Sequence, residues 1–266
     1  EEVLAGAVKM LNNLSADLDV MRPSMLETGL ETIAYNLNRQ ISSIALFEMG
    51  KVYGQSSKGA YYESEQLAIY LSGKQQQDGW RAKGVLADFF VAKGAATAIF
   101  NLLGMQGGAW KQTSTHQIDY AINKKTIGHL QAIGAKKLQA FGIKQPVFYI
   151  QFDLANLFSI YQSKQVVYQE ISKYPSVERD LALVIPQDTK YEAIEACVNE
   201  AKLEALKESR VFDIFESDKL GAQKKSVAIN FVFNTADKTL TDTEIDTMMK
   251  KLVQLFEKNL TAEVRK

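Results

Sequence analysis

The order of strand and helix patterns between residues 174 and 266 constrains the fold more than any other feature of this chain. Apolar and other residues alternate from Asp180 to Ile185, and a period of two indicates a strand with one buried face. From Asp188 to Ala201 apolar residues recur at steps of three and four, which predicts a helix that buries Cys197. This half of the chain therefore begins with a strand followed by a helix.

The same half ends with two more strands, a helix and a short strand. Alternating residues predict strands at 209–216 and 225–233 that pair as a hairpin. Thr241 and Glu244 have the spacing of a capping box, which predicts a helix start, and a last strand is expected near 263–265. Strand, helix, strand, strand, helix, strand is the order of a ferredoxin-like fold, in which both helices cover one face of an antiparallel sheet. The other face stays open.

Strand alternation also predicts which side chains occupy the open face. If Phe212 and Ile214 point towards the helices, the residues that point away are Val211, Asp213 and Phe215 of one strand, and Ser226, Ala228 and Asn230 of the next. An aromatic ring beside polar groups suits stacking of an unpaired base and hydrogen bonding to its edge. Sheets of this kind also bind proteins, so a protein-interaction module that touches no RNA is the competing interpretation.

Charge and composition exclude several classes of protein. Residues 173–266 hold 15 Lys or Arg and 17 Asp or Glu, so a broad basic footprint is absent. A single cysteine excludes an internal disulfide, and two distant histidines do not have metal-ligand spacing. No apolar run is long enough for a membrane span, and a cytoplasmic protein is expected. The chain begins without methionine, and we expect it to be a fragment of a longer protein.

Four segments of the second half resemble one known domain. Together they resemble the ferredoxin-fold anticodon-binding domain of bacterial phenylalanine-tRNA ligase beta subunits. The segments are residues 174–182 (YPSVERDLA), 211–215 (VFDIF), 224–228 (KKSVA) and 237–242 (DKTLTD). The resemblance implies anticodon contacts for Asp213, Phe215, Ser226, Arg265 and Arg179. Phe215 stands where the family usually has tyrosine, and Glu178 where it usually has a second arginine.

The first half resembles the synthetase-like module of the same beta subunits. The similar segments are residues 14–26 (LSADLDVMRPSML), 35–39 (YNLNR) and 46–53 (LFEMGKVY). The resemblance implies an α+β chain with a truncated, non-catalytic class II synthetase-like antiparallel sheet with helices at 1–165 and an anticodon-binding domain at 173–266. A helical stripe of Leu26, Leu30, Ile33 and Leu37 suits a core or a partner equally well, and the resemblance favours a subunit interface. Gly29 interrupts this helix, and a close partner backbone would explain it.

No catalytic chemistry is expected in this part of the enzyme. Further strands are predicted near residues 66–71, around Lys124 and at 147–152, with a helix near 88–103, but the glycine-rich segment that ends in Glu-Arg and holds ATP in class II synthetases is absent. His129 is expected to be structural. The resemblance implies no cofactor here, ATP and magnesium in the complete enzyme, and a heterotetramer of two alpha and two beta subunits that binds phenylalanine tRNA, with catalysis in alpha. A free-standing enzyme would need an enclosed polar pocket in the first half.

Overall fold

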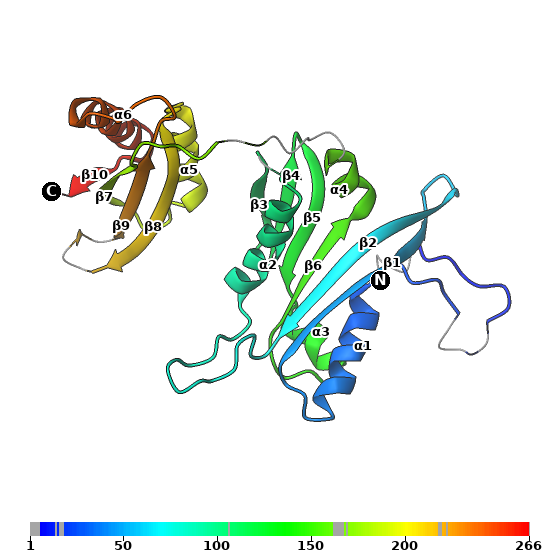
Figure 1. Ribbon diagram of the computed structural model, residues 1–266. Coiled ribbons are helices and arrows are strands. Elements are labelled where there is room, and N and C mark those ends of the chain that lie inside the picture. The colour runs from blue at the N-terminus through cyan, green and yellow to red at the C-terminus, as the bar shows by residue number, and fades with distance from the viewer. Residues whose placement is uncertain are drawn as a thin grey trace. The chain divides into compact units, whose positions relative to one another are not determined.

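The computed structural model divides the chain into two compact units, residues 1–167 and 168–266 (Figure 1). Each unit has its own hydrophobic core. Part of the expected boundary, residues 163–167 and 169, lies outside the described part of the chain. The structure describes residues 6–13, 15, 19–105, 107–161, 168, 170–217, 220–221 and 223–265.

The first unit is one antiparallel sheet with helices on both faces. Its six strands have the order β1-β2-β6-β5-β4-β3, and every neighbouring pair is antiparallel. The sequence-based prediction of an antiparallel sheet with helices is confirmed. The elements are α1 (Leu26–Leu37), β1 (Ile44–Gln55), β2 (Tyr61–Ser72), α2 (Phe89–Leu102), β3 (Ala109–Ser114), β4 (Gln117–Ile122), β5 (Lys125–Ala132), α3 (Ala135–Ala140), β6 (Val147–Asp153) and α4 (Leu154–Tyr161).

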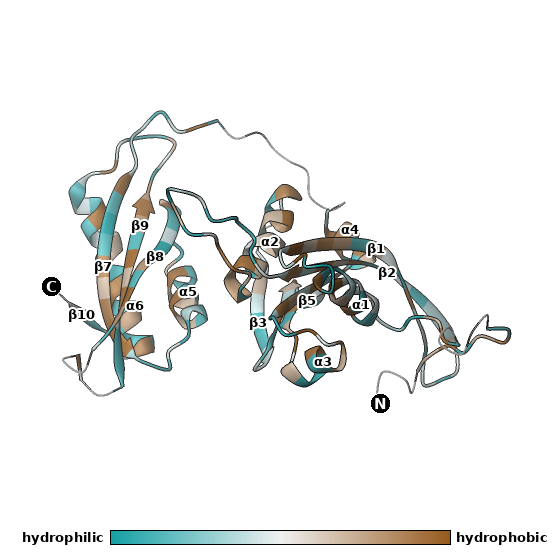
Figure 2. Ribbon diagram, turned by 90° about the horizontal axis from the view of Figure 1, so that it is seen from below, coloured by the Kyte–Doolittle hydropathy of each residue, from teal (hydrophilic) through white to brown (hydrophobic). Residues whose placement is uncertain are grey.

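Two cores fill the two faces of this sheet. Helices α2 and α4 cover one core, where Phe100 stacks on Tyr120 with ring centroids 3.9 Å apart and meets Phe152 edge-on. Helices α1 and α3 cover the other core, in which Tyr70 and Tyr149 lie almost fully buried. Figure 2 shows α1 and α3 on the same side of strands β1 and β2. Both faces of the sheet are therefore used for the unit's own packing.

The apolar stripe of α1 belongs to the core of the first unit. Leu26, Leu30 and Ile33 are at most 8% exposed, and Leu37 packs on the same cluster. The prediction of a subunit interface is wrong for Leu26, Leu30 and Ile33, because the unit's own sheet already buries them, whereas Leu37 is only partly buried. Glu31, Thr32 and Tyr35 are the exposed residues of this helix's middle turns. An amphipathic pattern shows that a stripe is buried but not what buries it.

Gly29 faces an aromatic ring of its own unit. A Cβ atom at Gly29 would lie 2.1 Å from the Tyr70 ring, whose hydroxyl donates a 2.6 Å hydrogen bond to the Met25 carbonyl. Burial raises the pKa of this phenol, so it remains a donor. A close partner backbone, the explanation expected from the sequence, is therefore wrong. The ring of Tyr70 needs the space that a side chain at Gly29 would fill.

Gly29→Ala is expected to destabilise the first unit by about 1–3 kcal/mol, because it forces extra volume into a filled core. Gly94→Ala in α2 is the matched control, since no atom lies within 4 Å of its added Cβ. That control is expected to stabilise the unit by about 0.5–1 kcal/mol through helix propensity. Urea unfolding followed by tryptophan fluorescence measures both. Equal shifts in the two variants would contradict the close approach of Tyr70.

The second unit has the predicted strand and helix order. Its four-stranded antiparallel sheet has the order β10-β7-β9-β8, so the ferredoxin-like fold expected from the sequence is confirmed. Cys197 is 3% exposed, as its place on the helical stripe predicts. Within the described residues, no helix of either unit is long and apolar enough to cross a membrane. The elements are β7 (Val177–Pro186), α5 (Tyr191–Glu200), β8 (Leu206–Glu216), β9 (Lys224–Phe233), α6 (Asp242–Leu260) and β10 (Glu263–Arg265).

The predicted capping box starts α6. The Thr241 hydroxyl accepts from the Glu244 amide, and the Glu244 carboxylate accepts from the Thr241 amide at 2.9 Å. Lys238 also donates to this carboxylate. The Lys238 hydrogen bond and then the Thr241 amide lower the pKa of Glu244 to about 2. The helix start is thus held by one ionised carboxylate.

Glu244→Gln is expected to lower the melting temperature at pH 7 and to have a smaller effect at pH 3. The folded-state pKa of Glu244 lies below its unfolded value of 4.5, so its contribution is present above pH 4.5 and is lost as the pH falls towards 2. Asp246→Asn, one position beyond Ile245 on the same helix, removes an equal charge and is the control. Thermal melts of both variants at the two pH values test this. If the difference in melting temperature between Glu244→Gln and the unchanged protein is the same at pH 3 and pH 7, the prediction is contradicted.

Candidate nucleic-acid interface

The face of the second sheet opposite α5 and α6, here called the open face, is defined by the residues of β9. Val227, Ile229, Phe231 and Phe233 are at most 2% exposed and pack with α5 and α6. Alternation then turns Ser226, Ala228, Asn230 and Val232 to the open face. This part of the sequence-based prediction is confirmed.

Strand β8 does not follow simple alternation. The register shifts between Val211 and Asp213, which pair with Ile229 and Ala228, so Phe212 is an extra residue. Val211 packs on the helix-covered core, and Phe212 is 54% exposed. The predicted directions of Val211 and Phe212 are therefore wrong, because a β-bulge reverses the alternation at one point. Beyond the bulge, Asp213 returns to the open face as predicted.

Asp213, Phe215 and Ser226 meet on the open face. Phe215 pairs with Ser226, and Asp213 pairs with Ala228, whose other neighbour is Ala182. Phe215 is 51% exposed, whereas Ser226 is 7% exposed and presents little surface to a ligand. The two alanines make a low floor beside the Phe215 ring. This arrangement suits a flat aromatic ligand that stacks on the ring and donates to the Asp213 carboxylate.

The two arginines named from the resemblance are not placed equally. Arg179 pairs with the buried Phe231, and its guanidinium donates to Asp242 of α6 at 2.6 Å. It lies on the helix-covered face and so is not brought together with Asp213. The backbone of Arg265 pairs with Ala182, in the row that contains Asp213, while its side chain lies outside the described part of the chain.

A second group of polar side chains lies further along the open face. The Asn230 amide donates from Nδ2 to Asp180 Oδ1 at 2.7 Å and to Glu178 Oε2 at 3.2 Å. Asn230 is 7% exposed, and its Oδ1 atom is buried without a hydrogen-bond partner. We did not predict this cluster from the sequence, although alternation on β7 places Glu178 and Asp180 on one face. The missing information was the pairing register, which brings Asn230 between them.

Acidic side chains outnumber basic ones on the open face. Lys224 is held by Glu263 at 2.6 Å, which leaves Arg210 as the free cation among the described side chains of this face. The register also places there the acidic residues Glu178, Asp180, Glu208 and Asp213, and the backbone of Arg265. The described side chains of this surface therefore offer more hydrogen-bond acceptors than phosphate-binding cations.

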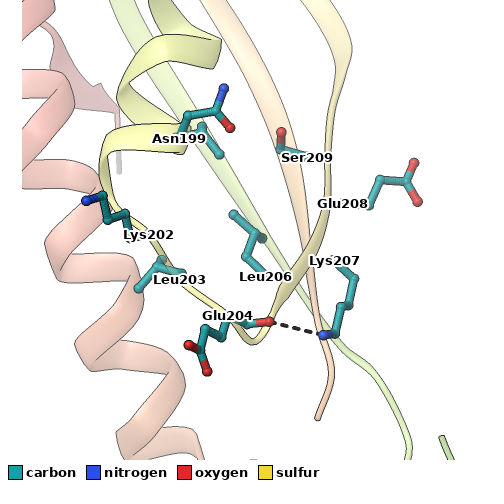
Figure 3. Close-up of a pocket in the computed structure, with 9 residues that line it drawn as sticks. Asn199, Lys202, Leu203, Glu204, Leu206, Lys207, Glu208 and Ser209 are labelled. Carbon is teal, nitrogen blue, oxygen red and sulfur yellow. Dashed lines mark hydrogen bonds between the residues drawn. The ribbon is translucent and has the colours of Figure 1, made fainter. Parts of the chain in front are cut away.

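The hollows of the two units do not resemble enzyme pockets. One of about 430 Å³ lies open between the end of α5 and the start of β8, where the Lys207 ammonium donates to the Glu204 carbonyl at 3.0 Å (Figure 3). In Figure 3 the charged ends of Lys202, Glu204 and Glu208 point in different directions. A hollow of about 650 Å³ in the first unit is likewise open to solvent. Neither brings polar groups together as an enzyme site would.

His129 has the features of a structural histidine. It lies on β5 opposite Asp119 and Gln151. Burial lowers the pKa of this imidazole, and the Asp119 carboxylate opposes that effect. Among the described residues, no three His, Cys, Asp or Glu side chains are placed to hold a metal ion.

Comparison with known proteins identifies the family. A family model described as the phenylalanyl tRNA synthetase beta chain CLM domain matches residues 2–154, more than half of the chain. The chain belongs to the phenylalanyl-tRNA synthetase beta-chain family. A second model, the ferredoxin-fold anticodon binding domain, matches residues 172–265. The resemblance of this chain to the beta-chain family, stated from its sequence motifs, is confirmed.

Relatives in the beta-chain family match nearly the whole chain. A phenylalanine–tRNA ligase beta subunit from Bacteroides fragilis is 33% identical over 97% of this chain and 33% of its own length. One from Geobacillus kaustophilus is 29% identical over 98% of this chain and 33% of its own. The chain thus spans about a third of the length of these relatives. A crystal structure of pyrrolysyl-tRNA synthetase from Desulfitobacterium hafniense has a TM-score of 0.46 at 15% identity, over 62% of this chain and 56% of its own.

Proposed function

We propose that this chain is a non-catalytic part of a phenylalanine–tRNA ligase beta subunit and that its open face contacts the anticodon region of phenylalanine tRNA. The half-exposed Phe215 ring beside Asp213 and the alanine floor carries this proposal. The match of the second unit to an anticodon-binding family supports it. The complete cytoplasmic enzyme attaches phenylalanine to its tRNA using ATP and magnesium.

The catalytic residues of that enzyme lie in the alpha subunit, and two alpha and two beta subunits assemble. In this arrangement the first unit supplies architecture rather than chemistry. The apolar stripe of α1 packs in the core of the first unit, so contact with the alpha subunit uses other surfaces of this unit. Expression of both subunits together and measurement of the assembled mass test this stoichiometry.

Contact with the bases rather than with the phosphates follows from the charge of the open face. An unpaired base stacks on Phe215, and the carboxylate of Asp213 accepts a hydrogen bond from the base edge. Because phenylalanine has no hydroxyl, this ring contributes stacking alone. The acidic surroundings add no attraction for the RNA backbone.

The affinity for an anticodon stem-loop RNA is therefore expected to depend only weakly on salt. With about two phosphate contacts or fewer, the slope of log K against log salt is expected to be shallower than about −1.5. Fluorescence anisotropy of a labelled stem-loop between 50 and 200 mM salt measures this slope. A slope steeper than about −4 would show that phosphate contacts dominate and would contradict recognition through bases.

A protein-interaction module is the alternative, and the exposed Phe212 and Ile214 are the observations in its favour. Binding of the full chain to phenylalanine tRNA and to the same tRNA with a substituted anticodon separates the two functions. Preference for the native anticodon supports the proposed function. Equal binding of both RNAs would leave the protein-interaction module as the better account.

A further inference from the structure

The amide of Asn230 holds two carboxylates of the open face in fixed positions. Its Nδ2 atom donates to both Asp180 and Glu178, and among the described residues it is the hydrogen-bond partner of both side-chain carboxylates. Asn230 is buried, whereas Glu178 and Asp180 are exposed. Each carboxylate keeps free lone pairs that point to solvent or to a ligand.

The direction of this amide follows from its chemistry. If it were turned over, Oδ1 would face two carboxylates, and three acceptors would repel one another. In the observed direction, Oδ1 is buried and lacks a donor. A buried acceptor without a donor is costly, and the two hydrogen bonds from Nδ2 keep the amide in this direction.

The cluster lies one step along the sheet from Asp213 and two steps from Phe215. Asn230 lies two residues from Ala228, the partner of Asp213, and four residues from Ser226, the partner of Phe215; along a strand these spacings are about 7 Å and about 13 Å. A base stacked on Phe215 therefore leaves another base of an opened-out loop within reach of this cluster.

We propose that Asn230 positions Glu178 and Asp180 as a second base-reading site, selective for bases that present amino donors, with guanine preferred. This proposal rests on the proposed RNA-binding function. Guanine presents an imino N–H and an amino group side by side on its Watson–Crick edge, and Glu178 and Asp180 offer acceptors for both, while Arg210, which pairs with Asn230 from β8, is the donor placed beside them. Uracil presents a single imino N–H between two carbonyl oxygens there and lacks an amino group, so it is disfavoured. Asn230 is a positioning residue, and the two carboxylates make the contact.

The test uses the full chain and anticodon stem-loop RNAs in which one loop base at a time lacks its amino group, with inosine for guanosine and purine riboside for adenosine. At one position the loss of the amino group is expected to weaken binding to the unchanged protein roughly tenfold. In the Glu178→Gln and Asn230→Leu variants, removal of the amino group from the same loop base is expected to weaken binding only about twofold or less. Glu178 is exposed, so Glu178→Gln keeps the test valid if Asn230→Leu does not fold.

Glu208→Gln is the matched control, because Glu208 and Glu178 both pair with Val232 and carry the same charge. In this control, removal of the amino group is expected to weaken binding as much as it does with the unchanged protein. If no analogue weakens binding, or if Glu178→Gln and Glu208→Gln behave alike, the second site is overturned while Phe215-dependent binding remains. If native and substituted anticodon loops bind equally to the unchanged protein, the proposed function fails and the second site fails with it.

Discussion

Gly73→Ala is expected to destabilise the first unit strongly and to leave the stability of the second unit unchanged. Gly73 has a φ of +72°, and an added Cβ would lie 1.8 Å from the Ser42 carbonyl oxygen. That carbonyl cannot move away easily, because Gln145 holds it at 2.9 Å and also holds the buried Ser72 hydroxyl at 2.7 Å. Backbone strain and the clash together are expected to cost about 3–5 kcal/mol, a large part of the stability of one domain.

Separate probes can follow the two units in this experiment. Both tryptophans, Trp80 and Trp110, belong to the first unit, and the single cysteine, Cys197, is buried in the second. Tryptophan fluorescence during urea unfolding therefore reports on the first unit, and the thiol reaction rate reports on the second. Gly142→Ala is the control, since Gly142 has a φ of +69° but no atom within 4 Å of its added Cβ.

The control is expected to lose about 1 kcal/mol from backbone strain alone. The Gly73 variant is expected to lose its native fluorescence at far lower urea while Cys197 stays protected. Similar unfolding midpoints for the two variants would show that Ser42 gives way easily. Rapid thiol reaction in the Gly73 variant would show that the two units do not fold independently.

Phe215→Ala is expected to weaken binding of the anticodon stem-loop by about 1–3 kcal/mol, which is roughly 5- to 150-fold, because one base loses its stacking partner. Since Phe215 is 51% exposed, the change is expected to alter folding stability by less than about 0.5 kcal/mol. Fluorescence anisotropy measures affinity, and a thermal melt checks the fold.

Ile214→Ala is the matched control for this variant. Ile214 is 58% exposed on the same strand, but its pairing with Val227 places it on the helix-covered face. It is expected to leave RNA affinity within about twofold. If both variants lose affinity equally, the effect belongs to strand β8 in general and the stacking role of Phe215 is refuted. Phe215→Tyr keeps the ring and is expected to retain binding.

Local patterns predicted the elements of the second unit well. The capping box of Thr241 and Glu244 fixes the start of α6, because both hydrogen bonds arise within four residues. Alternation on β9 gave the correct face for Asn230 because that strand pairs regularly with β7. These features depend on neighbours in sequence, and a sequence displays them directly.

Features that depend on distant residues could not be predicted in the same way. The bulge at Phe212 exists because two strands pair out of step, and neither strand shows that alone. The stripe of α1 showed that Leu30 would be buried, but the sheet that covers it comes from other segments. Arg179 was expected among the anticodon contacts from the resemblance, and its ion pair with Asp242 depends on where α6 begins.

The most direct test of the account is to map the backbone amide NMR shifts of the full chain while the native anticodon stem-loop is added. We expect the shifts to change in β9 between Ser226 and Val232 and in β8 from Asp213 to Phe215. The amides of α5, α6 and the first unit should stay unchanged, and a stem-loop with a substituted anticodon should have a much smaller effect. Changes that gather on α5 and α6 or in the first unit, or that are the same for both RNAs, would contradict recognition of the anticodon by the open face.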